Sequence, residues 1–259
     1  MTFLDEYENQ LRQIILREEL FCLKDYSHVI FDDKNALAFL ELIDETRLFL
    51  NTDGCIDLLT SDLIQSISPA IQFSLANVYL YFPGANNFLN ERVRSGNQEY
   101  STYSQTLEDR RFFYYINCTF EKLYNFWDRI GDMLNMGLDL KISERSVYFA
   151  TVIEKLNETG IKSENYFKLK TFYETDYKDY LNRLRKLIVH YREKQTYFTF
   201  EWINSFVEEN NYETISKLQK EKNELPGLLK DQLKLSNLGF ELAVRLISEI
   251  GLYENKPIF

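Results

Sequence analysis

Apolar residues recur along the chain at the three- and four-residue spacing of an amphipathic helix, and no stretch alternates apolar and polar residues long enough to require a sheet. The clearest helix opens at Thr106, which forms a capping pair with Asp109, runs to Met136 and closes at Gly137. Its apolar stripe comprises Ile116, Phe120, Leu123, Trp127, Ile130 and Leu134. The pattern therefore predicts an all-α fold.

Start and stop signals divide the remaining chain into further helices. Ser143 and Ser163 are the predicted N-caps of two of them, Pro83 stops an earlier one, and Pro226 opens the last one. The predicted helices cover residues 4–23, 33–50, 63–81, 143–160, 163–194, 197–209, 211–223 and 226–250. We find no internal repeat and no segment of low complexity.

The least regular part of the chain is residues 84–104, which contain the run Gly-Ala-Asn-Asn and later Arg-Ser-Gly-Asn-Gln. We place a boundary there. Residues 1–105 are predicted to form an N-terminal helical extension, packed on a helical bundle of residues 106–259. Because no linker-like run of Gly, Ser or Pro separates the two parts, one compact unit is expected.

Composition narrows the possible functions. The formal net charge of −10 argues against loose, nonspecific nucleic-acid binding, which depends on neutralising phosphates with Lys and Arg. Any RNA site must therefore be local. The three cysteines have no paired spacing, so neither a disulfide framework nor a metal site is expected, and we predict no cofactor.

The sequence predicts a cytoplasmic location instead of a membrane-bound or secreted one. The N-terminus lacks the basic and apolar regions of a signal peptide. The most apolar stretch, residues 64–82, is interrupted by Gln65, Pro69, Gln72 and Asn77, so it is predicted to be a buried helix instead of a membrane span.

The candidate chemistry lies between Asp179 and Arg192. This stretch contains His190, one of only two histidines, within the densest cluster of positive charge in the chain. Histidine exchanges a proton near neutral pH, and a fixed cation such as Arg185 suits chemistry at a phosphate. The basic residues of the cluster are Arg183, Arg185, Lys186, Arg192 and Lys194.

The spacing of this pair suggests a shared site. The predicted core stripe of this helix comprises Tyr177, Leu181, Leu184, Ile188 and Tyr191. Residues five apart on a helix point about 140° apart, so Arg185 and His190 flank this stripe on opposite sides. Between them on the outer face lies Val189, where a solvated helix would carry a polar residue. A two-fold dimer, in which each helix lends its Arg and His to one cleft, explains this arrangement.

The spacing Arg185-x4-His190 on a long helix resembles the Arg-x(4–6)-His motif of the HEPN superfamily. The segment from Asn117 to Arg129, which includes Phe-Trp-Asp-Arg, is similar to the helix that precedes this motif in the Cthe_2314-like branch. The resemblance covers roughly the second half of the chain and implies a helical bundle of HEPN type. It leaves residues 1–105 unexplained.

The resemblance implies a metal-independent endoribonuclease acting in stress response or antiviral defence, with RNA as substrate. His190 would be the acid or base when the ribose 2′-hydroxyl attacks phosphorus, and Arg185 would neutralise the developing charge, leaving 2′,3′-cyclic phosphate ends. The basic residues Lys186, Arg183 and Arg192 are the candidate phosphate contacts, and Asp128 is a candidate to orient His190. A homodimer is expected, with an antitoxin or activating partner possible.

Other interpretations stay open at this stage. Lys186 stands where the family often has Asn or another polar residue, and it cannot accept a hydrogen bond. A histidine at a helix border is commonly a packing or capping residue, and a charge run is usually a solvated helix face. The alternative function is therefore a noncatalytic HEPN-like module for dimerisation or for binding a partner or nucleotide.

Overall fold

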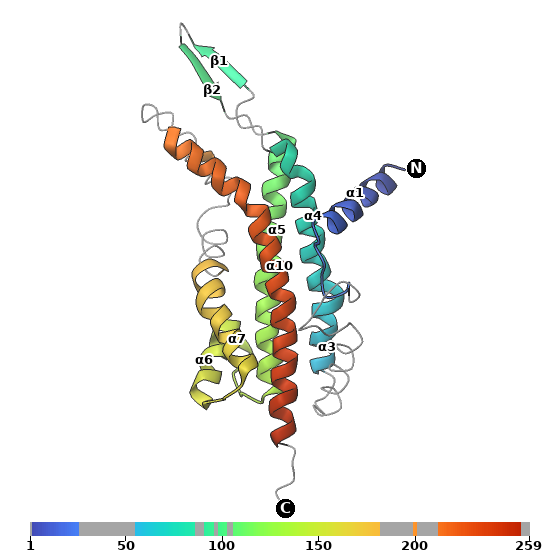
Figure 1. Ribbon diagram of the computed structural model, residues 1–259, viewed down its shortest axis with the longest axis vertical. Helices are drawn as coiled ribbons and strands as arrows, with labels where there is room; N and C mark the ends of the chain where they lie inside the picture. Colours follow the sequence, from blue (N-terminus) through green and yellow to red (C-terminus); the bar gives the residue numbers. More distant parts are fainter. Residues whose placement is uncertain are drawn as a thin grey trace, which may run out of the picture. The chain divides into compact units, whose positions relative to one another are not determined.

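The computed structural model describes residues 2–25, 55–85, 91–95, 98–102, 106–181, 199–200 and 212–254 of the 259-residue chain. Nearly all secondary structure within these residues is helical, which confirms the all-α fold class (Figure 1). The chain divides into two compact units. The first draws its described residues from the segments Met1–Leu20, Phe73–Phe120 and Arg185–Asp231, and the second from Phe21–Gln72, Glu121–Leu184 and Gln232–Phe259.

The first unit begins with α1, Phe3–Arg17, which has a complete capping box. The Thr2 hydroxyl accepts from the Asp5 backbone N–H at 3.2 Å, and the Asp5 carboxylate accepts from the Thr2 N–H at 2.6 Å. The Tyr7 hydroxyl then donates to Asn77 Oδ1 at 2.6 Å, which ties α1 to α4, Ser68–Ala85. This helix is shorter than the predicted 4–23, because the chain leaves the helix after Arg17 and reaches a positive φ at Glu19.

Helix α5 spans Leu107–Gly137. Its N-terminal part packs against α4 in the same unit through aromatic rings. Tyr81 and Tyr115 stack with centroids 5.9 Å apart, and Phe82 lies 5.6 Å from Phe112. The predicted capping pair is confirmed, since the Asp109 N–H donates to the Thr106 hydroxyl at 3.1 Å.

A two-stranded antiparallel hairpin lies in the chain between α4 and α5, in the region predicted to be irregular. Strand β1, Glu91–Ser95, pairs with β2, Gln98–Thr102. The apolar and polar pattern did not predict these strands, because they are short and their residues do not alternate over enough positions.

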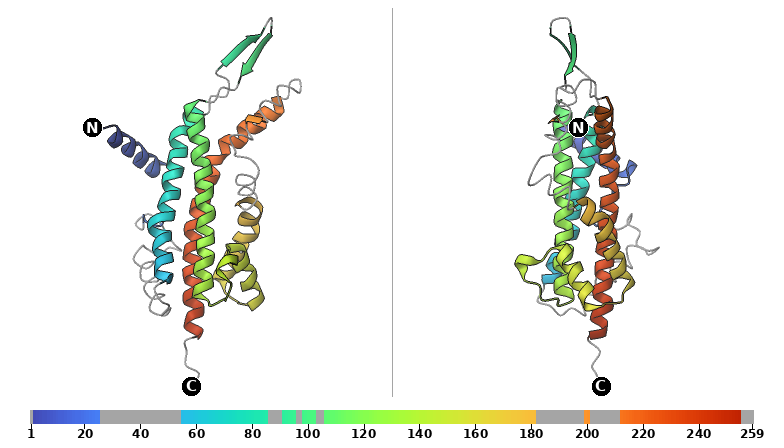
Figure 2. Two further views of the ribbon diagram at one scale, coloured as in Figure 1. Left: turned by 180° about the vertical axis from the view of Figure 1, so that it is seen from behind. Right: turned by 90° about the vertical axis from the view of Figure 1, so that its left-hand side faces the viewer.

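The second unit contains the C-terminal parts of α5 and of α10, Tyr212–Glu254, together with shorter elements. These are α3 (Cys55–Asp62), the π-helical turn η1 (Leu63–Ile67), the 3₁₀ turn η2 (Glu144–Ser146), α6 (Phe149–Thr159), α7 (Glu164–Phe172) and the π-helical segment η3 (Tyr173–Leu181). In all views α6 and α7 lie beside the C-terminal part of α5 (Figures 1 and 2). This packing forms the core around Trp127, which is 1% exposed.

Two helix termini in this unit confirm predictions, and one predicted N-cap is wrong. Ser163 caps α7 by accepting from the Tyr166 N–H, and Gly160 ends α6 in the left-handed conformation at φ 70°. Ser143, however, caps no α-helix: its hydroxyl bonds to that of Ser146, and α6 begins only at Phe149.

Prolines proved poor guides to helix boundaries. The predicted helix 63–81 is part of a helical run from Cys55 to Ala85, with Pro83 inside its last turn. The two predicted helices 211–223 and 226–250 are one, α10, with Pro226 inside and with its end at Glu254. A proline within a helix costs about 3 kcal/mol. Burial of apolar side chains at helical spacing on both sides of Pro226 offsets that cost; they are Leu218, Leu225, Leu229 and Leu233.

Some predictions lie outside the described residues. They include the helix at 33–50, most of the helix at 197–209, and the long helix beyond Leu181. Among the helices that the structure does describe, none is long and apolar enough to cross a membrane.

Candidate functional site

The segment from Asn117 to Arg129 lies entirely on α5, as predicted. Its Phe-Trp-Asp-Arg end divides between core and surface. Phe126 and Trp127 are buried, Asp128 is half-buried, and Arg129 is exposed. The segment therefore has a structural face, made by the two aromatic rings, and a polar edge formed by the two residues that follow them.

Trp127 is the centre of an aromatic cluster that joins α5 to three other elements. Its ring stacks on Phe172 of α7 with centroids 4.0 Å apart and lies 4.8 Å from Phe149 of α6. Phe149 in turn contacts Tyr177 of η3 edge-on at 5.1 Å. Such contacts fix the direction of α7 and η3, because aromatic pairs stabilise by about 1 kcal/mol beyond their buried area.

Two glycines allow this close packing. A Cβ on Gly239 of α10 would lie 2.2 Å from the Trp127 ring. One on Gly131 of α5 would lie 2.9 Å from the backbone nitrogen of Phe149. Larger side chains at either position would push the neighbouring element away, since real Cβ atoms do not approach so closely.

The polar edge of α5 carries the candidate orienting residue. Asp128 is half-buried, and its Oδ1 atom is shielded from solvent. The next residue, Arg129, is held by two carboxylates, Asp132 at 3.0 Å and Asp62 of α3 at 3.7 Å. Whether Asp128 meets His190 stays a prediction.

The residues of the basic motif lie outside the described part of the chain. This applies to Arg183, Arg185, Lys186, His190 and Arg192. The structure describes the helical segment that leads into them, which ends at Leu181, four residues before Arg185.

That leading segment is firmly held in the second unit. Tyr177, the first residue of the predicted core stripe, is 1% exposed and stacks near Tyr124 of α5 at 6.0 Å. The Tyr173 hydroxyl donates to Glu154 of α6 at 3.0 Å, and burial, together with this carboxylate, raises the pKa of Tyr173 to about 12. The described part of this segment is therefore fixed on the α5 core.

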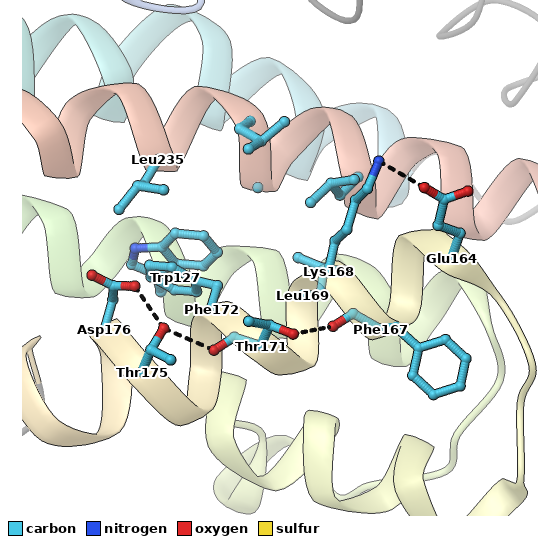
Figure 3. A pocket seen from close by; sticks show the side chains of 13 residues that line it. Trp127, Glu164, Phe167, Lys168, Leu169, Thr171, Phe172, Thr175, Asp176 and Leu235 are labelled. Carbon is cyan, nitrogen blue, oxygen red and sulfur yellow. Dashed lines mark hydrogen bonds and ion pairs between the residues drawn. The ribbon is translucent and has the colours of Figure 1, made fainter.

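A cavity of about 490 Å³ opens beside Trp127 (Figure 3). Side chains from α5, from α7 with η3, and from α10 line it, all within the second unit. Apolar groups form most of its wall, and the polar groups are at its rim. Sequence reasoning did not find this cavity; the signals were Gly239 inside a helix and the exposed apolar residues Phe167 and Leu238.

The Cthe2314-like HEPN family matches residues 70–248, which is more than half of the chain. The chain belongs to the HEPN family. A search of the curated proteins and a search of the solved structures found no significant match. The resemblance drawn from the sequence is thereby confirmed.

The HEPN domain includes most of α4, all of α5, α6 and α7, the motif residues, and α10 as far as residue 248, while α1 and α3 precede it. The match thus starts earlier in the chain than residue 106, where the bundle was expected to begin. The division at residue 105 into an extension and a core stays a prediction.

In the described residues, no group of three or more His, Cys, Asp or Glu side chains could hold a metal ion.

The HEPN domain also contains a buried ion pair that sequence reasoning missed. Lys222 of α10 is 0% exposed, and its Nζ donates to Asp109 Oδ1 at 2.8 Å and to the carbonyl oxygen of Ala85. The rings of Phe112 and Phe113 lie 5.6 and 5.4 Å from the same nitrogen. Burial lowers the pKa of Lys222, while the bond to Asp109 and its charge act in the opposite direction.

This ion pair joins three helices of the first unit at one point. Ala85 is the last residue of α4, and Asp109 lies in the first turn of α5, so Lys222 holds together the two ends between which the hairpin is inserted. No sequence signal marks it, because a lysine on an amphipathic helix normally faces solvent.

Proposed function

We propose that this HEPN domain is a metal-independent endoribonuclease whose chemistry is performed by Arg185 and His190. The observation that carries the proposal is the Arg185-x4-His190 spacing inside the family match, in a family that often contains ribonucleases. The described geometry supports it in one respect. The segment that precedes the motif, as far as it is described, is anchored on α5 through Tyr177.

The proposed reaction is an attack of the ribose 2′-hydroxyl on the adjacent phosphorus. His190 takes the proton of that hydroxyl or delivers a proton to the leaving 5′-oxygen. Arg185 stabilises the negative charge that develops on the phosphoryl oxygens. The bond from phosphorus to the 5′-oxygen breaks, so the products carry a 2′,3′-cyclic phosphate and a 5′-hydroxyl.

Neighbouring residues hold the substrate and the base. Lys186, Arg183 and Arg192 bind flanking phosphates, which confines RNA binding to one basic region of an acidic chain. Asp128 orients His190 from α5. Its half-buried position and shielded Oδ1 suit a residue that acts by hydrogen bonding, because a carboxylate in such a place interacts strongly with a nearby imidazole.

The proposal includes a homodimer in which two copies form one cleft, and a role in cytoplasmic stress response or antiviral defence. Because the activity of such a ribonuclease must be controlled in the cell, the proposal includes an antitoxin or an activating partner. The second candidate function is a noncatalytic HEPN module. Lys186 and the net charge of −10 favour it, because they weaken the case for an RNA active site.

The test is cleavage of tRNA, rRNA and mRNA pools with a metal chelator present, comparing the wild type with His190→Ala and Arg185→Ala. Each variant must first show unchanged helical content and thermal stability. General acid–base and charge-stabilising groups each contribute about 10²-fold or more, so each variant should lose at least that factor in rate. Equal cleavage by the wild type and His190→Ala would exclude the proposed chemistry and favour the noncatalytic module.

A further inference from the structure

The cavity beside Trp127 has the properties of a ligand site. Its volume of about 490 Å³ lies in the range of small-molecule pockets, which are mostly apolar and carry a few polar groups that fix orientation. Its apolar wall is formed by Trp127, Leu169, Phe172, Leu235 and Leu242. Of these, Leu169 is 0% exposed and Trp127 is 1% exposed, so this part of the wall belongs to the core.

A buried hydrogen-bond donor lies at this wall. Within the described residues, the Nε1 of Trp127 is shielded from solvent and forms no hydrogen bond. An unsatisfied buried donor costs about 1–3 kcal/mol, and native proteins usually pair such groups. In Figure 3 the nitrogen edge of the indole faces the end of the cavity where Leu235 and Asp176 lie. Leu235, which is half-buried, lies beside this nitrogen.

The charges at the rim are not balanced. At one end Lys168 and Glu164 neutralise each other across 3.1 Å. At the other end Asp176 accepts a hydrogen bond from the Thr175 hydroxyl at 2.7 Å, and among the described residues no cation pairs with it. The described residues of the rim therefore leave one negative charge, that of Asp176, at the end that also holds the Trp127 N–H.

We propose that this cavity binds a small organic cation, with its apolar body against Trp127 and Phe172 and its ammonium group on Asp176. A hydrogen-bond acceptor next to the ammonium would take the Trp127 N–H. The ammonium neutralises the charge of Asp176, and the apolar body occupies an apolar cavity that water hydrates poorly. This site goes beyond the ribonuclease function, and its test involves no RNA.

The test is titration calorimetry of the full chain with two ligands that have the same body. The first is 1-naphthylmethylamine, which is cationic at pH 7, and the second is the neutral 1-naphthalenemethanol. Saturable binding of the amine, about tenfold or more tighter than that of the alcohol, is expected because a charge-assisted hydrogen bond is lost with the alcohol. In Asp176→Asn the two ligands should bind equally.

A matched pair of variants locates the site. Thr171 lies at the rim and Thr159 ends α6 outside the cavity; both are exposed, and both hydroxyls bond to a carbonyl of their own helix, at 2.9 and 2.7 Å. Thr171→Trp should abolish binding by filling the cavity, whereas Thr159→Trp should leave binding unchanged.

The indole N–H of Trp127 gives a second readout by NMR. Its resonance, assigned with the variant Trp202→Phe, should shift when L-phenylalaninamide, a probe that carries a hydrogen-bond acceptor, is added.

Several results would overturn the proposal. They are no saturable binding of the amine up to millimolar concentration, equal affinity of the wild type for amine and alcohol, or undiminished binding by Thr171→Trp. If Thr171→Trp instead disrupted self-association while no amine bound, the cavity would belong to an interface between two copies of the chain. Loss of RNA cleavage in any variant has no bearing on these outcomes.

Discussion

Removal of the buried ammonium of Lys222 should destabilise the protein strongly. In Lys222→Met the carboxylate of Asp109, which is 1% exposed, loses its cation, and the carbonyl of Ala85 loses a donor. Breaking one partner of a buried ion pair costs about 3–5 kcal/mol. For a chain of this size that corresponds to a decrease in Tm of about 6–20 °C.

The informative measurement is a double-mutant cycle with Asp109→Asn, followed by urea unfolding. An asparagine can still accept from the Thr106 N–H, so the cap of α5 is kept while the charge is removed. The double variant should lose much less than the sum of the two single variants, because it leaves no unpaired charge. Lys220→Met is the control. Lys220 is on the same helix, its side chain is 77% exposed, and its loss should change stability by at most about 0.5 kcal/mol.

Strict additivity of the two single variants would refute this reasoning, since it would mean that the charges do not interact. A loss below about 1 kcal/mol for Lys222→Met would refute it as well, because the pair would then be solvated in the folded state.

Three further predictions concern packing, orientation and a thiol. Gly131→Ala should lower the free energy of unfolding by about 1–3 kcal/mol, because its Cβ meets backbone, whereas Gly227→Ala, with nothing within 4 Å, should stabilise by about 0.5–1 kcal/mol; urea unfolding measures both. Asp128→Asn should slow RNA cleavage and move the His190 limb of the pH–rate profile to lower pH, because a carboxylate near the imidazolium is lost; an unchanged profile argues against the orienting role. Cys22, whose pKa burial raises from 9.0 to about 12, should resist alkylation at pH 8 until urea is added. Because deprotonation of this thiol favours the unfolded state, it should contribute to a fall in Tm as pH rises from about 9 towards 12.

Local signals in the sequence were sufficient where a helix end depends on adjacent residues. The capping pair Thr106 and Asp109, the cap at Ser163 and the helix end at Gly160 are all present in the structure. The stripe on α5 was also correct, and its member Trp127 is the centre of an aromatic cluster in the second unit. Each of these features is determined within a few residues along the chain.

The remaining features depend on contacts that no local pattern encodes. Pro226 marks a helix start in isolation, yet buried leucines on both sides keep α10 continuous. Lys222 is buried because Ala85 and Asp109, both distant in sequence, supply its acceptors. The cavity is lined by Trp127 of α5 and Gly239 of α10, which are far apart in the sequence, and periodicity along one helix cannot reveal such a pairing.

The central claim is that the ribose 2′-hydroxyl, activated through His190, is the nucleophile in RNA cleavage. The most direct test uses an RNA oligonucleotide that the wild type cuts with chelator present, synthesised again with a single 2′-deoxyribose on the 5′ side of the cut. The account predicts that cleavage at this position stops, while the unmodified oligonucleotide yields 2′,3′-cyclic phosphate and 5′-hydroxyl ends. Continued cleavage of the 2′-deoxy substrate at the same position, or products with 5′-phosphate ends, would contradict it.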